Sequence, residues 1–129
     1  MDREQKSSAP AVRDVEELVV YRKAYTLSLE IHRTSLTLPR HEQWALADQM
    51  RRASKSICAN LAEGFGKQSI SKPDFKRFVA MAMGAADEMR VWIQYCIDLG
   101  YVEAKLGTAW RSEYRDIAKM LTGLHQKWM

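Results

Sequence analysis

The feature that most constrains this chain is an apolar repeat of helical period that recurs in four long stretches and is broken only by short turns. The stretches cover about residues 15–35, 42–65, 71–99 and 103–127. Apolar residues that recur every three or four positions lie on one face of an α-helix, whereas none of the stretches alternates with the period of two that is typical of a strand. Short turns make successive helices antiparallel. The sequence therefore predicts an all-α fold, an antiparallel up-down-up-down four-helix bundle.

The same repeat predicts which side chains of each helix face the core. The expected core rows, in chain order, are Leu18, Tyr21, Tyr25, Leu29 and His32; Leu46, Met50, Ala53, Ile57 and Leu61; Phe75, Phe78, Val79, Ala82, Ala85, Ala86, Met89, Trp92, Ile93 and Cys96; and Leu106, Trp110, Ile117, Met120, Leu121, Leu124 and Trp128. In the first helix, a second apolar row lies on the flank of the expected core row and consists of Val20, Ala24, Leu27 and Ile31.

Capping residues predict several helix ends. Ser71 is expected to be the N-cap of the third helix, with Asp74 three residues later in a variant of the capping box. Gly64 and Gly66 suit a C-terminal cap of the second helix, and Gly100 is expected to close the third.

The chain of 129 residues is long enough for one domain with a core of its own. Residues 1–14 are polar and lack apolar periodicity, so they are expected to form a flexible N-terminal tail, and residues 15–129 to form the bundle domain.

Cys58 and Cys96 lie far apart and are expected to act as small apolar residues. Neither a signal-peptide core nor a stretch long enough to span a membrane is visible, so the expected location is the cytoplasm, with no membrane partner.

The second and third helices carry small or apolar residues on the side away from the expected core. The expected interface residues are Ala59, Asn60, Ala62, Glu63, Ala80, Gly84, Val91 and Tyr95. A helix that is apolar around most of its circumference is normally buried around most of it, which favours self-association. Asn60 and Glu63 are expected to hydrogen-bond to a neighbouring helix or subunit and to fix its register. The alternative is that these are scattered surface residues, which are common.

Motifs that carry chemistry are missing from the sequence. The segment "HEQWA" begins a zinc-protease motif but has Ala45 where the second histidine belongs. No Glu-x-x-His or Cys-x-x-Cys spacing occurs, and "GFGK" (64–67) lacks the spacing of a phosphate-binding loop and follows a helix instead of a strand. We therefore expect no catalytic residue, no metal, no cofactor and no enzymatic activity.

Positive charge is concentrated in the middle of the chain. The whole chain has a formal charge of +4, and residues 33–77 hold nine Lys/Arg against four Asp/Glu. The candidate nucleic-acid-binding residues are Arg51, Arg52, Lys55, Lys67, Lys72, Lys76 and Arg77. Since no Tyr or Trp is interleaved with them, they predict contact with the phosphates of RNA or DNA without reading of the bases. For Arg51, Arg52 and Lys55, ion pairs in a subunit interface remain an alternative, and a salt-bridged bundle surface remains one for every residue of the set.

A series of motifs runs through the first three helices. It consists of Tyr21 with Ala24; Thr37 and Pro39; Glu42, Leu46 and Gln49; "RRA" at 51–53; "SI" at 56–57; Asn60; "AEG" at 62–64; Gly66; "FKRFVAMAMGAADEM" at 75–89; and "DLGYV" at 98–102. In these motifs the chain resembles a known family of four-helix-bundle proteins, named after products of intervening sequences in bacterial large-subunit ribosomal RNA genes. The resemblance covers about residues 17–128, is most specific in the second and third helices and is diffuse in the fourth. The chain departs from the family pattern in having alanine at 85–86, where serine is frequent, and in its acidic N-terminal tail.

The resemblance implies an antiparallel four-helix bundle and a ring-like homo-oligomer, with five copies as the expected number. More distantly, the chain is similar to the accessory proteins of diversity-generating retroelements, which implies a basic pentameric barrel that binds nucleic acid and a reverse transcriptase. The leading hypothesis is a non-catalytic, oligomeric protein that binds nucleic acid or acts as a scaffold. The alternative is a protein-protein interaction module with no nucleic-acid ligand.

Overall fold

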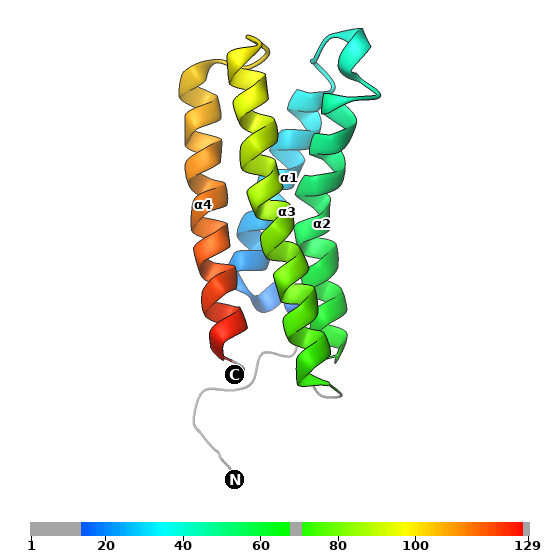
Figure 1. Cartoon of the computed structure of the whole chain (residues 1–129), viewed down its shortest axis with the longest axis vertical. Coiled ribbons are helices and arrows are strands. Elements are labelled where there is room, and N and C mark those ends of the chain that lie inside the picture. The colour runs from blue at the N-terminus through cyan, green and yellow to red at the C-terminus, as the bar shows by residue number, and fades with distance from the viewer. Residues whose placement is uncertain (1–13, 68–70, 128–129) are drawn as a thin grey trace.

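Four long helices account for most of the described chain, residues 14–67 and 71–127, in a computed structural model of the protein (Figure 1). They are α1 (Val19–Ser35), α2 (Leu46–Lys67), α3 (Lys72–Asp98) and α4 (Ala104–Lys127). Two short 3-10 helices, η1 (Val15–Glu17) and η2 (Arg40–Glu42), precede α1 and α2. Apart from Asp14, the expected flexible tail (1–14) lies outside the described residues, as does Trp128.

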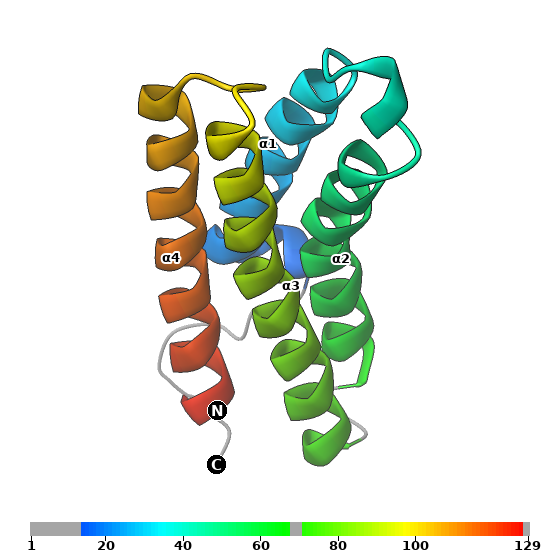
Figure 2. The same ribbon diagram turned by 45° about the horizontal axis from the view of Figure 1, so that its top comes forward.

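Successive helices run antiparallel, which confirms the predicted all-α bundle (Figures 1 and 2). α2 packs against α1 and α3, α3 also packs against α4, and α4 closes the bundle against α1. α1 and α3 make no direct helix contact, so they lie on one diagonal of the bundle. The seam between α1 and α4 is the least closely packed of the four. Two polar contacts cross it: the Trp110 indole Nε1 donates to Glu30 Oε1 at 3.0 Å, and Lys23 Nζ lies 3.5 Å from Glu113 Oε1.

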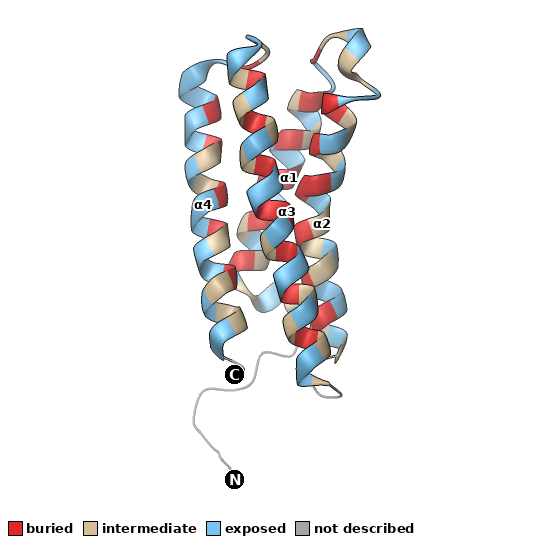
Figure 3. Cartoon of the chain, viewed as in Figure 1, coloured by how far each residue is buried: buried red, intermediate tan, exposed pale blue. Residues whose placement is uncertain are grey.

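The core runs the length of the bundle (Figure 3) and is largely apolar, with Ser28, Ser35 and Ser54 as its buried polar residues. Its largest buried side chains are Trp110, Tyr114, Phe75, Leu27, Ile31, Met50, Ile57, Leu61, Met89, Ile93, Ile117 and Leu121. The expected core rows of α2 and α3 are confirmed, with Phe78 and Trp92 half-buried at their edge.

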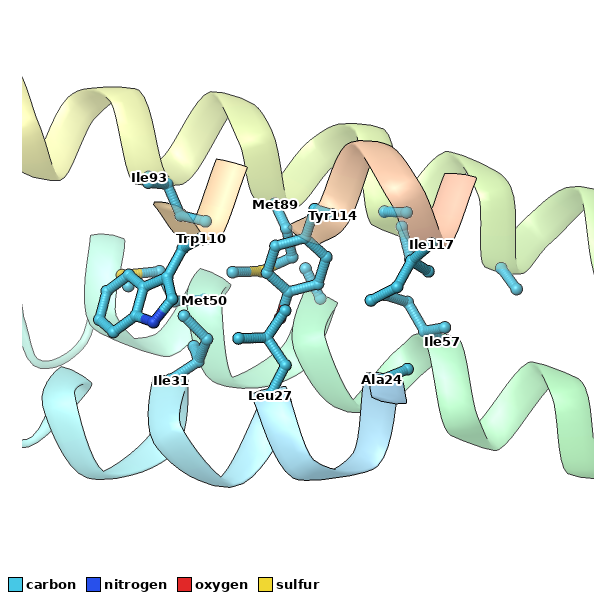
Figure 4. Packing of buried hydrophobic residues seen from close by; sticks show 14 of the residues in the cluster. Ala24, Leu27, Ile31, Met50, Ile57, Met89, Ile93, Trp110, Tyr114 and Ile117 are labelled. Atoms are coloured by element: carbon cyan, nitrogen blue, oxygen red, sulfur yellow. The ribbon is translucent and has the colours of Figure 1, made fainter. Parts of the chain in front are cut away.

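The core row predicted for α1 is wrong: the apolar row beside it on the helix faces the core instead. Val20, Ala24, Leu27 and Ile31 are buried, whereas Tyr25 and Leu29 of the expected row are 49% and 37% exposed. Figure 4 shows Trp110 and Tyr114 pointing from α4 into the core that Leu27 and Ile31 line. These two large rings fill the space beside α1, so the row with the smaller side chains faces them.

The core row predicted for α4 is wrong in two positions, since Leu106 and Met120 are exposed while Gly107 and Tyr114 are buried. A Cβ atom at Gly107 would lie 2.5 Å from Ile97 Cγ1. The absence of that atom lets α4 approach α3 closely, and this approach sets the face that α4 turns inward.

Gly64 and Gly66 do not cap α2, as the sequence had suggested, because the helix continues to Lys67. Gly64 is buried, and a Cβ atom there would lie 3.1 Å from Phe78 Cβ and 3.4 Å from the Phe75 carbonyl oxygen. Gly64 therefore serves close approach of α2 and α3. The other predicted caps are confirmed: Asp74 N–H donates to Ser71 Oγ at 3.2 Å, and Gly100, with φ of +78°, closes α3.

Arg51 ties the connection between α1 and α2 to the bundle. Its Nη1 donates to Ser35 Oγ at 2.9 Å and to Gln43 Oε1 at 3.3 Å, and its Nη2 donates to the Gln43 carbonyl at 2.8 Å. The Gln43 amide in turn donates to the carbonyls of Ser35 and Leu38 at 2.9 and 3.0 Å. One guanidinium thus joins the last residue of α1 to the segment that leads into α2.

Replacing Arg51 by methionine is expected to lower the free energy of unfolding by about 1.5–3 kcal/mol, because half-buried acceptors lose a charged donor. The measurement is the midpoint of urea unfolding. Arg52→Met is the matched control, since Arg52 pairs with Asp48 on the surface and its side chain is 75% exposed. That exposed pair contributes at most about 0.5 kcal/mol. Equal midpoints for the two variants would show that Arg51 does not hold the connection.

The two glycines of α2 are expected to respond to substitution in opposite directions. Gly64→Val should destabilise the fold by about 1–3 kcal/mol because it overpacks the contact with Phe78. Gly66→Ala should stabilise it by up to about 1 kcal/mol, because alanine favours helix and nothing lies within 4 Å of a Cβ atom there. Thermal unfolding of both variants tests the pair. A loss of stability in Gly66→Ala would instead indicate a capping conformation at that position.

Candidate functional site

The seven basic residues singled out in the sequence do not form one surface. Arg51, Arg52 and Lys55 lie in the first half of α2, whereas Lys67 ends α2 and the remaining three begin α3. Lys55 and Lys67 are twelve residues apart, which corresponds to roughly 18 Å along a helix. The positive charge of residues 33–77 is therefore divided between two regions of the bundle.

The first region is largely occupied by contacts within the chain. Arg51 is bound to Ser35 and Gln43, and Arg52 Nε lies 2.8 Å from Asp48 Oδ2 in an i,i+4 ion pair. Lys55 Nζ lies 2.8 Å from His32 Nδ1 across the α1–α2 seam. Of these three, only Arg52 is paired with a described carboxylate; Arg51 is held by neutral acceptors and Lys55 by the His32 imidazole.

His32 and Arg33 belong to this region, although the sequence analysis did not assign them to it. The positive charge of Lys55, followed by burial and the charges of Arg51 and Arg33, lowers the pKa of His32 below its ordinary value. Burial and then Arg51 lower the pKa of Lys55. His32 is thus held as a neutral imidazole whose Nδ1 accepts a hydrogen bond from Lys55. No sequence signal marks this pair, because its members are 23 residues apart on two helices.

The second region, which we call the basic end, consists of Lys67, Lys72, Lys76 and Arg77 at the junction of α2 and α3. Arg77 Nη2 lies 3.5 Å from Asp74 Oδ1, and its guanidinium lies 4.5 Å from the centre of the Phe78 ring. The side chains of the three lysines have no hydrogen bond or ion pair with any residue that the structure describes. The basic end is therefore the part of the predicted set that is free to bind an anion.

The expected interface residues on α3 do form one exposed face. Ala80, Gly84, Val91 and Tyr95 are all exposed, Val91 by 51% and Tyr95 by 53%, and we call them the α3 ridge. A groove of about 600 Å³ runs beside this ridge towards α4 and is also lined by Asp87, Arg90, Gln94, Asp98 and Arg111. The ridge itself is apolar, and the groove beside it is lined by charged residues.

The expected interface residues on α2 are also at the surface. Ala59, Ala62 and Glu63 are exposed, and Asn60 is half-buried. The Asn60 side-chain amide donates to the Ser56 carbonyl and to Ser56 Oγ, both at 2.9 Å, so within one copy it binds its own helix and not a neighbouring one. A hydrogen bond from Asn60 or Glu63 to another subunit stays a prediction.

A second apolar face runs along α1 and includes residues that the sequence analysis had expected in the core. We call it the α1 ridge: Leu18 and Tyr21 are half-buried and pack against the core, whereas Tyr25, Leu29 and Leu36, just beyond the end of the helix, are exposed. The rings of Tyr21 and Tyr25 stack with centres 6.1 Å apart and planes 17° apart. A shallow groove of about 420 Å³, lined by these rings and by Glu16, Arg22 and Thr26, lies along the ridge. The signal was present in the sequence, since the first helix carries two apolar rows and only one of them can face the core.

Among the described residues, neither a group of metal ligands nor a reactive thiol is found. No group of three His, Cys, Asp or Glu side chains lies close enough to hold a metal ion within residues 14–67 and 71–127. Burial raises the pKa of both thiols, Cys58 and Cys96, to about 11, which makes them poor nucleophiles. No described helix is both long enough and apolar enough to cross a membrane.

Comparisons with known proteins agree with the fold. A crystal structure from Bacteroides thetaiotaomicron VPI-5482, described as a protein with unknown function from the S23 ribosomal protein family, superposes with a TM-score of 0.74. The two sequences are 23% identical over 84% of this chain and 96% of the other, which supports a shared fold. No curated protein matches the sequence. The sequence model of the 23S rRNA-intervening sequence protein family matches residues 16–123, and the chain therefore belongs to that family.

Proposed function

We propose that this protein is a non-catalytic, self-associating protein that binds the phosphate backbone of RNA or DNA through its basic end. The observation that carries the proposal is the set of three lysines, Lys67, Lys72 and Lys76, that have no carboxylate partner among the described residues. An unneutralised cation on the surface attracts phosphate and releases the counterions that phosphate holds.

The surroundings of the basic end strengthen its attraction for anions. The start of α3 carries the positive end of the helix dipole, close to Lys72. The ion pair between Arg77 and Asp74 is long, at 3.5 Å, and exposed, so phosphate can compete with the carboxylate for the guanidinium. Self-association would add to this, because several copies of a weak site bind one long polyanion together.

The same surroundings support binding without reading of the bases. The aromatic residues beside the basic end, Phe65 and Phe78, are half-buried, and the strongly exposed aromatic rings, Tyr25, Trp44 and Tyr95, belong to other parts of the bundle. Stacking on exposed rings is how proteins hold unpaired bases. Nucleic acid is the polyanion to test first, since the family is named for intervening sequences of 23S rRNA.

A second candidate function, docking of another protein, is favoured by one observation at the opposite end of the bundle. Trp44 is 89% exposed, and Leu36 and Leu99 are 60% and 53% exposed. Exposed large apolar side chains are typical of protein interaction sites. Binding that persists after nuclease treatment and that Trp44→Ser abolishes would favour this candidate over nucleic acid.

Replacing Lys72 and Lys76 together by glutamine is expected to weaken binding to double-stranded DNA equally for unrelated sequences. For two lost phosphate contacts, the slope of log K against log salt concentration should flatten by about 1.8. The measurement is fluorescence anisotropy with two duplexes of equal length and unrelated sequence, over a series of salt concentrations.

The matched control for this prediction is Arg40→Gln/Lys105→Gln, which removes two exposed charges at the opposite end of the bundle. The control should lower affinity only slightly and leave the slope close to that of the wild type. An equal loss in both double variants would indicate a general effect of net charge. A wild-type protein that binds neither duplex nor single-stranded RNA at low salt would rule the proposal out.

A further inference from the structure

We propose that the α1–α2 seam carries a second anion site, which binds one phosphate group together with a proton. Its members are His32, Arg33, Arg51 and Lys55. The site is distinct from the basic end, because Lys55 and Lys67 are roughly 18 Å apart along α2. It also differs in chemistry, since the basic end consists of permanent cations, whereas a histidine gains or loses its charge near neutral pH. The inference therefore goes beyond the proposed function.

The pair of His32 and Lys55 is the centre of the site. Lys55 Nζ lies 2.8 Å from His32 Nδ1, and this contact holds only while the imidazole is neutral, because an imidazolium has no acceptor to offer the ammonium. The charge of Lys55, followed by burial and by the charges of Arg51 and Arg33, lowers the pKa of His32. In the absence of an anion, the seam therefore disfavours a further positive charge at this point.

Three positive charges surround the imidazole without a described carboxylate to neutralise them. The side chain of Lys55 binds only His32, and Arg51 donates only to neutral acceptors. Arg33, next to His32 on α1, is exposed, and its side chain has no hydrogen bond or ion pair with any described residue. An anion at this seam would therefore meet unneutralised positive charge from both helices.

The carboxylates of α2 that are nearest in sequence do not neutralise these charges. Asp48 forms an ion pair with Arg52 at 2.8 Å, so those two charges offset each other. Glu63 lies eight residues beyond Lys55, which corresponds to about 12 Å along the helix. The thiol of Cys58, one turn beyond Lys55, is uncharged at neutral pH because burial raises its pKa to about 11. The net charge that α2 contributes to the site is therefore positive.

The carboxylates of α1 and η2 that are nearest in sequence bind other partners. Glu30 lies about 160° around α1 from His32 and accepts a hydrogen bond from the Trp110 indole of α4 at 3.0 Å. In η2, Glu42 accepts a hydrogen bond from the Tyr101 hydroxyl at 2.8 Å. The remaining ionisable residues of η2 are Arg40 and His41, which are basic. Neither segment therefore supplies a carboxylate that competes with an anion for the site.

A phosphate group would convert the repulsion within the site into attraction. When His32 takes a proton from solvent, both of its ring nitrogens become donors, and Lys55 can direct its own donors to the anion. The guanidinium of Arg33 can add a two-pronged contact with two phosphate oxygens. Negative charge beside the imidazolium raises the pKa of His32. Proton and phosphate are therefore bound together, and each increases the affinity for the other.

The charge of the site suits a dianion better than a carboxylate. With His32 protonated, its four members carry four positive charges. A phosphate monoester carries about −1.5 to −2 charges near neutral pH and offers three strong acceptor oxygens, whereas a carboxylate has one charge and two oxygens. Inorganic phosphate and the terminal phosphate of a nucleic acid present the same chemistry, and the experiment below separates these two sources.

The test is the pKa of His32, measured by NMR from the imidazole resonances of the full chain, which are assigned with His32→Gln. Titrations in sodium sulfate and in sodium chloride of equal ionic strength are compared, because sulfate mimics phosphate and stays doubly charged throughout. In sulfate, the pKa of His32 should be higher by about one unit or more. One unit corresponds to about tenfold tighter binding of sulfate to the protonated site. His41 and His125 are controls in the same spectra and should shift much less.

Three variants locate the response. Lys55→Met should raise the pKa of His32 in chloride, because the main cause of its lowering is removed, and should abolish most of the difference between the two salts. Lys55→Arg keeps the charge and should keep the difference. Lys72→Met removes a lysine of the basic end and should leave the pKa of His32 unchanged in both salts. Circular dichroism should show the same helix content for all three variants.

Inorganic phosphate and short RNA oligonucleotides identify the source of the anion. If the ligand is the end of a nucleic acid, an oligonucleotide with a 5′-phosphate should raise the pKa of His32 more than the same oligonucleotide with a 5′-hydroxyl. Equal responses to the two oligonucleotides, with a larger response to inorganic phosphate, would assign the site to free phosphate.

A pKa of His32 that is the same in sulfate and in chloride would overturn the proposal. Equal shifts at all three histidines would also overturn it, because they indicate a general effect of the salt. A difference between the salts that Lys55→Met leaves intact would show that the anion binds elsewhere. None of these outcomes bears on the basic end, which the salt dependence of the Lys72/Lys76 variant tests separately.

Discussion

The packing of α2 against α3 is the contact on which the rest of the structure depends. It is the most extensive helix contact of the bundle, and Gly64 makes it possible by leaving room for the backbone and Cβ atoms of Phe75 and Phe78. At the other end of the same seam, Met50 Sδ and Cys96 Sγ meet at 3.4 Å. With α3 fixed in this way, its own start supplies the basic end and its outward face supplies the α3 ridge. One close helix pair thus places both the basic end and the exposed apolar face of α3.

The number of helices, their antiparallel order and most of their caps could be predicted from the sequence, because they depend on local periodicity and on single residues such as Ser71 and Gly100. The inward face of α1 could not. Two apolar rows lie side by side on that helix, and the choice between them is made by Trp110 and Tyr114 about 80 residues away in the chain. Gly64 was misread for a similar reason, since a glycine that admits a neighbouring helix and a glycine that ends its own helix look alike in one sequence.

In the candidate site too, features that depend on the helical repeat could be predicted, whereas contacts between residues far apart in the sequence could not. The exposed face of α3 follows from the repeat, because residues outside the core row must lie opposite it. Whether a Lys or Arg side chain is paired or free depends on partners that the repeat does not predict. Arg51 binds residues eight and sixteen positions earlier, and Lys55 binds His32 on another helix. The residues that form one cluster of positive charge in the sequence therefore have three different positions: Arg51 holds the connection between α1 and α2, Lys55 pairs with His32 across the α1–α2 seam, and the basic end lies apart from both.

The loose seam between α1 and α4 has a consequence for motion. Proteins open in cooperative pieces before they unfold completely, and the piece with the least buried contact opens most easily. Here that piece is α1, which is joined to α4 by sparse packing and by the contacts of Trp110 and Lys23. The amide hydrogens of α1 should therefore exchange with solvent sooner than those of α2 and α3, whose shared contact is the most extensive of the bundle.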